Sequence, residues 1–324
     1  MSSSRKMHAD ELDIDDALVR RMIAAQFPQW AGLPVEEATT AGTSNAMYRL
    51  GPDLVVRIPR IPGAVEDIEK ESVWLRRLAA ELPVAVPVSL AQGRPGDGCP
   101  WPWSVLRWLD GANPVVGQVA EPALLAADLA EFVAALHRVD PVGGPASYRS
   151  EPLPERDGAV RAAIAGLAGV IDTAAATCAW EHALRAPGHP GPPVWIHADL
   201  QPGNLLVDGR GRLSAVIDFG CAGLGDPAVD LITAWYVLPA PVRAAFRTGA
   251  GADGAAWARG RGWALSVALL ELDYYRETDS RMAGIARHVI GEVLADHASP
   301  AGHASPAGHA SPAGHASPSG SRHS

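Results

Sequence analysis

The sequence predicts an α+β protein with two lobes, a small β-rich lobe followed by a larger helical lobe. Short extended segments, separated by Gly, Pro, Asn and Asp, crowd into residues 16–109. From about residue 121 onward, apolar residues recur with helical spacing instead. The chain has 324 residues and is 48% hydrophobic, which suffices for two lobes and a sizeable core.

The first lobe is expected over residues 16–109. Its first helix is predicted at about 16–27, and a second at about 65–82 has apolar residues at Val73, Trp74, Leu78 and Leu82. The predicted strands cover about 36–41, 46–50, 54–58, 88–91 and 103–108, with breaks at Gly42-Thr43-Ser44-Asn45 and Gly51-Pro52-Asp53.

The second lobe is expected over residues 110–296 and is predicted to be helical, beginning with a helix at about 121–137. One hairpin interrupts it. Strands at 205–207 and 213–217 flank a turn at 208–211, Asp-Gly-Arg-Gly. Because a hairpin brings the two ends of its strands together, we expect Asn204 and Asp218 to lie side by side.

Both ends of the chain differ from the lobes. Residues 1–15 are polar and are expected to be flexible. Residues 297–324 repeat His-Ala-Ser-Pro-Ala-Gly, and Pro and Gly in each repeat exclude a helix, so a disordered tail is expected. Five of the 11 histidines fall there, which leaves metal binding by the tail as an alternative.

Composition excludes several classes of protein. A net charge of −9 argues against a nucleic-acid partner. No apolar run reaches transmembrane length, the N-terminus lacks a signal-peptide core, and the 3 cysteines are too scattered for a disulfide framework. We therefore expect a cytoplasmic protein without a membrane partner, of undetermined oligomeric state. The net charge is −2 before Asp110 and −7 from there on, which together make the −9. An acidic second half would suit a cationic ligand, and an ordinary solvated acidic surface is the alternative.

The most informative motif lies in residues 195–231. His197, Asp199 and Asn204 form H-x-D-x-x-x-x-N, and Asp218 opens Asp-Phe-Gly 14 residues after Asn204. This is the spacing of a kinase catalytic loop followed by a metal-binding strand end. Phosphoryl transfer needs a carboxylate to accept the hydroxyl proton and oxygen ligands to hold Mg²⁺ against a triphosphate. The alternative, a buried strand pair with ordinary turn aspartates, does not explain the combined spacings.

Over about residues 20–296 the chain resembles the aminoglycoside phosphotransferase family, small-molecule kinases related in fold to protein kinases. The resemblance rests on Ile-His-Ala-Asp-Leu-Gln-Pro-Gly-Asn at 196–204 and Ile-Asp-Phe-Gly at 217–220, with softer support at 225–231 and 42–50. It implies a protein-kinase-like two-lobe fold and transfer of the ATP γ-phosphate to a small-molecule hydroxyl. ATP and Mg²⁺ are the implied cofactors.

The resemblance also implies roles for single residues. Asp199 is the expected base, and Asn204 and Asp218 are the expected Mg²⁺ ligands. His197 is expected to support the loop by hydrogen bonding. Asp226 and Asp230 are expected to cap or buttress it at the start of the next helix.

In the first lobe the nucleotide is expected to contact Gly42, Thr43, Ser44 and Asn45 through backbone N–H groups and short side chains. The third-strand position that is lysine in kinases is Arg57 here, with Glu71 as the expected partner; Arg60 is a weaker alternative. Arginine also binds phosphate, so nucleotide binding is expected, with altered geometry. Backbone groups of Arg107 and Leu109 are expected to bond adenine.

The acceptor is expected to be an antibiotic, with a cationic aminoglycoside ahead of a macrolide. Its pocket is expected in the helical lobe, where candidates are Trp235, Tyr236, Trp263, Glu271, Asp273, Tyr274 and Asp279, although most of the aromatic ones are expected in the core. Two alternatives remain open. One is a metabolic small-molecule kinase, and the other is a nucleotide-binding pseudokinase that regulates a partner, for which Arg57 is the only support.

Overall fold

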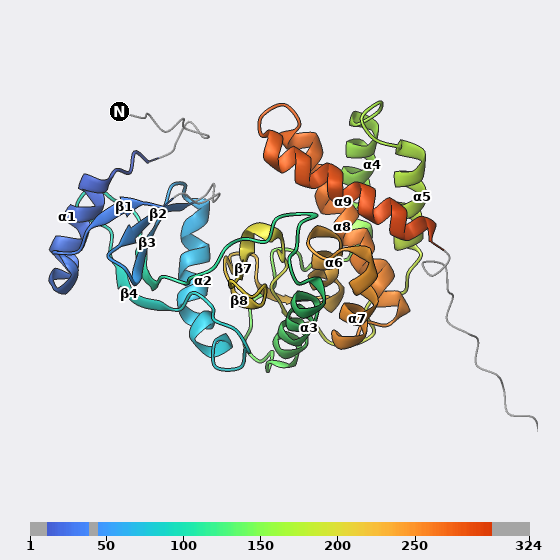
Figure 1. The fold of residues 1–324 in the computed structure, drawn as a ribbon. Helices are drawn as coiled ribbons and strands as arrows, with labels where there is room; N and C mark the ends of the chain where they lie inside the picture. Colours follow the sequence, from blue (N-terminus) through green and yellow to red (C-terminus); the bar gives the residue numbers. More distant parts are fainter. Residues whose placement is uncertain (1–11, 39–44, 300–324) are drawn as a thin grey trace, which may run out of the picture.

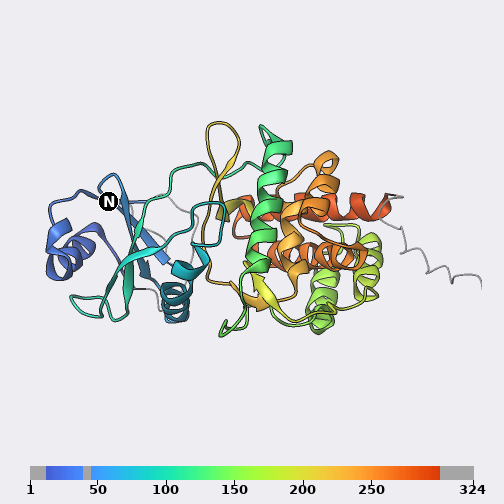
Figure 2. The ribbon, with the colours of Figure 1, turned by 90° about the horizontal axis from the view of Figure 1, so that it is seen from below.

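A computed structural model describes residues 12–38 and 45–299 of the chain. Its sheet-containing lobe and its helical lobe lie at opposite ends of an elongated molecule, as Figure 1 and the perpendicular view in Figure 2 show. The α+β two-lobe fold predicted from the sequence is confirmed.

The first lobe is built on a five-stranded antiparallel sheet in the order β1-β2-β3-β5-β4. Its elements are α1 (Asp16–Gln26), β1 (Val35–Glu37), β2 (Asn45–Leu50), β3 (Leu54–Pro59), α2 (Gly63–Leu78), β4 (Ser89–Gly93) and β5 (Trp103–Arg107), with a 3-10 turn η1 (Pro28–Trp30) after α1. α1 starts where the Asp15 carboxylate accepts the Leu18 N–H at 2.7 Å, and it buries Met22 and Ile23 in a core shared with Tyr48 of the sheet.

α2 lies between the sheet and the second lobe (Figures 1 and 2), and it differs from its prediction in two ways. It ends at Leu78 instead of Leu82, where the chain tightens into a turn in which Glu81 donates its backbone N–H to the Leu78 carbonyl at 3.0 Å. Leu82 itself precedes Pro83, and a residue before proline is disfavoured in a helix. Val73, predicted on the apolar face, is 66% exposed. The buried face instead contains Glu71, whose carboxylate is turned toward Arg57 of β3.

The second lobe is mainly helical. Its elements are α3 (Pro122–Arg138), η2 (Leu153–Arg156), α4 (Asp157–Gly166), α5 (Thr173–Leu184), β6 (Val194–Ile196), η3 (Pro202–Asn204), β7 (Leu205–Val207), β8 (Leu213–Val216), β9 (Gly223–Gly225), η4 (Pro227–Ile232), α6 (Thr233–Tyr236), α7 (Ala240–Gly249), α8 (Gly254–Tyr275) and α9 (Ser280–Ala298). α8 is the central helix and packs against α4, α5, α9 and η4. At Gly260 a Cβ would come within 2.7 Å of the Leu231 Cβ, so only glycine allows η4 to approach this closely.

The predicted hairpin is present as β7 and β8, which pair with Leu205 opposite Val216. A second pair, β6 with β9, was not predicted, because β6 is very short and the Gly-Leu-Gly of β9 has no strand pattern. The last helix continues to Ala298, two residues beyond the predicted end of the lobe. No helix in the described part of the chain is both long and apolar enough to span a membrane.

Candidate active site

The loop between β6 and β7 is held from within the second lobe by Asp230 of η4. The fully buried Asp230 carboxylate accepts the backbone N–H of His197 at 3.1 Å and that of Ala198 at 2.8 Å. It is also 3.1 Å from Nε2 of His137 on α3. These bonds hold Ala198 at a φ of 67°, which is strained for a residue with a side chain. The predicted buttressing role of Asp230 is therefore confirmed.

Asp226, predicted with Asp230 to cap or buttress this region, lies at the start of η4. Its carboxylate accepts the N–H of Ala228 at 2.9 Å and also pairs with Arg259 of α8 at 2.6 Å. It therefore caps η4 and ties it to the central helix.

His197 supports the loop and does not reach into the site. Its Nδ1 accepts the Asp199 N–H at 3.3 Å, so Nε2 carries the proton and donates to the Ile217 carbonyl at 3.1 Å. The ring packs edge-on against Phe219 with centroids 4.6 Å apart. Burial lowers the pKa of His197 and so favours the neutral ring, while the two hydrogen bonds fix its tautomer.

Asp199 projects from the loop and its carboxylate remains 23% exposed. Oδ2 accepts a hydrogen bond from the Asn204 amide at 2.8 Å. Oδ1 accepts from Gln201 at 3.2 Å and from Arg149 at 2.9 Å. The side chain predicted as the base is therefore ionically paired and held by three donors.

Asn204 and Asp218 lie close together, as expected from the predicted hairpin, because the backbone N–H of Ile217 donates a hydrogen bond to the Asn204 carbonyl at 2.9 Å. Asn204 uses its amide nitrogen to donate to Asp199, which leaves its amide oxygen for another ligand. Asp218 has a φ of 61° and its carboxylate is 55% exposed. An amide oxygen and a carboxylate are donors that Mg²⁺ accepts, with phosphates and water completing its shell.

Within the described residues, no group of three or more His, Cys, Asp or Glu side chains is arranged to hold a metal ion by itself. A site that relies on nucleotide phosphates for part of its ligands has no need of such a group.

Arg57 lies where its sequence position predicts, in a buried ion pair with Glu71 of α2. The Asn45 amide lies against the same guanidinium, and with its oxygen turned toward Arg57 it accepts from Nε at 3.2 Å and Nη2 at 3.1 Å. Nη2 is 3.9 Å from Asp218 Oδ1, so the cation faces the predicted metal ligand. Burial raises the pKa of Glu71 to about 7, although Arg57 opposes this shift.

Two further cationic residues of the first lobe, Lys70 and Arg60, have different surroundings. Lys70 of α2 donates to the carbonyl of Gly220, the last residue of Asp-Phe-Gly, and lies 3.8 Å from Asp67. Arg60, the weaker alternative to Arg57, points instead toward Glu37 of β1 at 3.9 Å. Its position is consistent with Arg57 as the phosphate-side cation.

The segment after β5 connects the lobes. The backbone N–H of Trp108 donates to the Asp53 carbonyl at 2.7 Å, so this N–H points into the sheet. Because the carbonyl and the N–H of one trans peptide point in opposite directions, the carbonyl of Arg107 faces away from Asp53. The predicted nucleotide contacts at Gly42, Thr43 and Ser44 lie outside the described residues.

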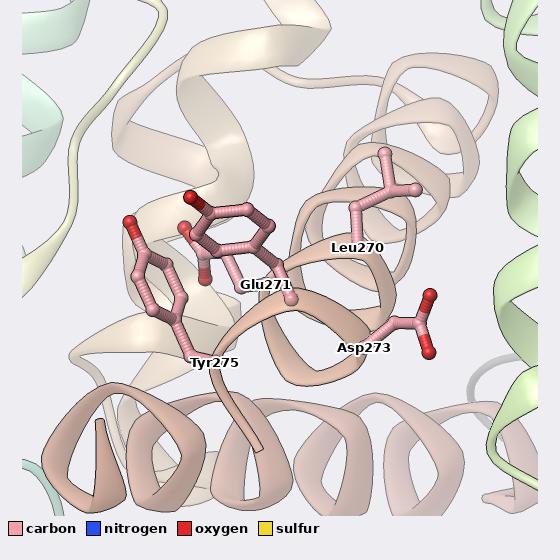
Figure 3. Close-up of a pocket in the computed structure, with 5 residues that line it drawn as sticks. Leu270, Glu271, Asp273 and Tyr275 are labelled. Atoms are coloured by element: carbon pink, nitrogen blue, oxygen red, sulfur yellow. The ribbon is translucent and has the colours of Figure 1, made fainter. Parts of the chain in front are cut away.

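An open hollow of about 640 Å³ lies at the end of α8, lined by Leu270, Glu271, Asp273, Tyr274 and Tyr275. Figure 3 shows Glu271 and Tyr275 on one side of the helix and Asp273 turned to the other. The Glu271 carboxylate accepts from Gln201 at 2.7 Å and from Tyr236 at 2.8 Å, and burial raises its pKa to about 7.

Gln201 therefore links this hollow to Asp199, a connection that the sequence motif did not reveal. Trp235, Tyr236 and Trp263 are buried, as expected for core aromatics, whereas Tyr274 is 66% exposed. The role of Arg149 was also missed, because it lies 50 residues before Asp199 and outside the motif.

Comparisons with a protein-family model and with solved structures both point to phosphotransferases. The model of the phosphotransferase enzyme family (APH) matches residues 37–263. The GDP complex of wild-type aminoglycoside 2′-phosphotransferase-IIIa has a TM-score of 0.68 at 21% identity, covering 88% of this chain and 100% of that one. No curated protein sequence gave a significant match.

Two other solved structures have the same fold. Macrolide 2′-phosphotransferase MphH from Brachybacterium faecium has a TM-score of 0.57 at 23% identity, covering 86% of this chain and 98% of that one. The streptomycin–ATP–APH(2″)-IIa ternary complex has a TM-score of 0.56 at 16% identity, covering 88% of this chain and 97% of that one.

The family match places the protein among the phosphotransferases, and the solved structures share its fold. The chain belongs to the phosphotransferase enzyme family, which confirms the resemblance to aminoglycoside phosphotransferases. It is a phosphotransferase.

Proposed function

We propose that the protein transfers the γ-phosphate of ATP, in the presence of Mg²⁺, to a hydroxyl of a small-molecule antibiotic, with an aminoglycoside ahead of a macrolide. One observation carries this proposal. The β7–β8 hairpin brings Asp218 beside Asn204, which bonds Asp199, while Arg57 faces Asp218 from the first lobe at 3.9 Å. A base, two metal-ligating oxygens and a phosphate-binding cation thus converge from three separate parts of the chain.

Asp199 is the proposed base. Its carboxylate orients the acceptor hydroxyl and takes its proton late in the transfer. The acceptor oxygen forms a bond to the γ-phosphorus as the bond from that phosphorus to the β–γ bridging oxygen breaks, and ADP leaves with the electron pair. His197 takes no part in this proton transfer, since its Nδ1 accepts the Asp199 N–H and its Nε2 donates to the Ile217 carbonyl.

Asn204 and Asp218 are the proposed Mg²⁺ ligands. The amide oxygen of Asn204 and the exposed carboxylate of Asp218 supply hard oxygen donors suited to this ion. Mg²⁺ held there would neutralise the charge that builds up on the transferring phosphate oxygens.

The nucleotide is proposed to lie under the first lobe. Arg57 would bind its phosphates, held by Glu71 and Asn45. Backbone groups of Gly42, Thr43, Ser44 and Asn45 would cover the phosphates, and adenine would bond the Arg107 carbonyl and the Leu109 N–H. Similar proteins have been solved with GDP and with ATP, so both nucleotides belong in the test.

The acceptor is proposed to occupy the hollow at the end of α8. Gln201 joins Glu271 in that hollow to Asp199, so a molecule bound there would have its hydroxyl near the base. The charge of −7 from Asp110 onward favours a cationic acceptor. The exposed ring of Tyr274 offers an apolar wall for a macrolide or another ring system.

The test is phosphate transfer with Mg²⁺ and either ATP or GTP across aminoglycosides, macrolides and simple metabolites, with mass spectrometry of the products. A phosphorylated aminoglycoside is the expected result. A product found only with a sugar or amino alcohol would favour the metabolic-kinase alternative. Nucleotide binding without transfer to any acceptor or to water would favour the pseudokinase and overturn the proposal.

A further inference from the structure

Arg149 reaches the catalytic loop from a part of the chain that the motif does not include. It lies in the segment between α3 and η2, and its side chain is 13% exposed. Nη1 donates to Asp199 Oδ1 at 2.9 Å and also to the carbonyl of Ala198. One guanidinium nitrogen therefore contacts both the strained residue of the loop and the proposed base beside it.

The segment that contains Arg149 is hydrogen-bonded to residues 221–224, which follow Asp-Phe-Gly in the sequence and lead into β9. Ser147 donates its N–H to the Leu224 carbonyl at 3.0 Å and its hydroxyl to the Cys221 carbonyl at 2.8 Å. The same hydroxyl accepts the Arg149 N–H at 3.1 Å. At Gly223 a Cβ would come within 2.6 Å of the Ser147 backbone, so only glycine permits this approach. The backbone of Arg149 is thus positioned independently of its contact with Asp199.

The hydrogen bonds of Asp199 distinguish its two oxygens. A carboxylate oxygen can accept about two hydrogen bonds. Oδ1 accepts from Arg149 and from Gln201, whereas Oδ2 accepts from Asn204 alone. Oδ1 is therefore saturated by its neighbours in the chain, and Oδ2 has one remaining position for the hydroxyl of an acceptor.

We propose that Arg149 is a positioning residue that, with Gln201, occupies Oδ1 of Asp199 and so makes Oδ2 the atom that receives the acceptor proton. The inference rests on the proposed function, because it assigns the proton-accepting atom of the same base. Without Arg149 the carboxylate turns about its Cβ–Cγ bond, and the Ala198 carbonyl loses a charged donor. A misplacement of about 1 Å at a reacting group lowers the rate by about 100-fold.

The experiment measures transfer of the γ-phosphate of ATP to water, for which the acceptor need not be known. It also measures transfer of this phosphate to any acceptor that has been identified. Arg149→Ala is expected to lower kcat by about 100-fold while the dissociation constant for the nucleotide stays within about twofold. Arg149→Lys keeps the charge but offers a single compact donor group, so an intermediate kcat is expected. Added guanidinium should restore part of the activity of Arg149→Ala.

Arg161→Ala is the matched control, because Arg161 also pairs with an aspartate, Asp157 at 2.8 Å, but lies on the surface of α4. Its kcat is expected to equal that of the unmodified protein. In an Asp199→Asn background, Arg149→Ala should lower kcat little further, because both residues act through one carboxylate.

The possible failures are distinguishable. An active protein whose Arg149→Ala variant keeps its kcat would overturn the role of Arg149 and leave the proposed function standing. A fall in kcat with no rescue by guanidinium and full additivity with Asp199→Asn would also overturn it, as a general structural effect. If Arg149→Ala does not fold, the kcat of Arg149→Lys decides. No transfer to water or acceptor by the unmodified protein would overturn both proposals.

Discussion

The two sides of the candidate site are built by different means. On the catalytic loop, the fully buried Asp230 accepts backbone N–H groups, and all the partners belong to the second lobe. On the phosphate side, charged side chains from separate elements meet, with Arg57 from β3, Glu71 from α2 and Asp218 after β8. The loop is therefore shaped by one lobe alone, whereas the phosphate-side cluster depends on how the two lobes meet.

The difference has consequences for substitution. Removing an acceptor that satisfies buried backbone groups leaves donors unpaired within the fold. Altering one member of a charged cluster mainly changes how ions and phosphates are held. The predictions below separate these two cases, beginning with the residue on which both sides converge.

Asp199→Ala is expected to have the largest effect. Loss of the proposed base should lower kcat by about 10³-fold or more while nucleotide affinity changes little. Steady-state kinetics with calorimetric titration of ATP would measure both. The control is Asp16→Ala, an exposed aspartate of α1 paired with Arg20, for which no change is expected. Retention of turnover in Asp199→Ala would contradict the assignment of the base.

Asp230→Ala tests the loop side. Two backbone N–H groups, of His197 and Ala198, would lose their acceptor inside the core, and we expect the free energy of unfolding to fall by about 4 kcal/mol. Urea denaturation would measure this loss. Asp230→Asn retains one acceptor oxygen and should lose less. A decrease below about 1 kcal/mol in the alanine variant would show that the loop is held mainly by other contacts.

Arg57→Lys tests the phosphate side. The guanidinium is held by Glu71 and Asn45 at once, and a compact ammonium cannot reproduce this geometry. We expect kcat/KM for ATP to fall by about 10-fold, with a smaller change in stability than in Asp230→Ala. Arg60→Lys is the control. Arg60 follows β3 directly and lies near Glu37 of β1, so this change should leave kcat/KM for ATP unchanged. Equal or higher activity with lysine at position 57 would show that the site is not adapted to arginine.

The last prediction concerns pH. Burial raises the pKa of Glu71 from 4.5 to about 7, so between these values the folded protein binds a proton that the unfolded chain releases. The contribution of Glu71 to stability is therefore present below about pH 4.5 and is lost as pH rises to about 7, by at most about 3 kcal/mol. Urea midpoints at several pH values should show a shallower decline in Glu71→Gln. An unchanged slope would contradict the shifted pKa of Glu71.

Much of this fold was predictable from local signals. The alternation of buried residues in β2, the short apolar run of β3, the helical spacing in α3 and the turn residues of the β7–β8 hairpin all lie within short segments of the chain. The pair of β6 and β9 was not predictable in this way. Its strands are short, one is Gly-Leu-Gly, and they are stabilised by neighbours that are distant in sequence.

The same contrast applies to the candidate site. Asp199, Asn204 and Asp218 were identified because their spacing follows from one loop and one hairpin. The partnership of Arg57 and Glu71 was expected from their positions on a strand and the following helix, and the ion pair is present. Arg149 and Gln201 gave no such signal, because an arginine in a loop and a glutamine in a motif are common and acquire meaning only from what they touch.

By itself, the sequence determined the class of chemistry, since phosphoryl transfer requires particular side chains at spacings that local structure sets. It also determined the two-lobe fold, because periodicity differs between the two parts of the chain. Only the tertiary structure decided which groups surround Asp199, which face of α2 meets Arg57, and which candidate aromatics are buried. The physical reason is that these contacts join residues far apart in sequence, and packing, not local propensity, selects them.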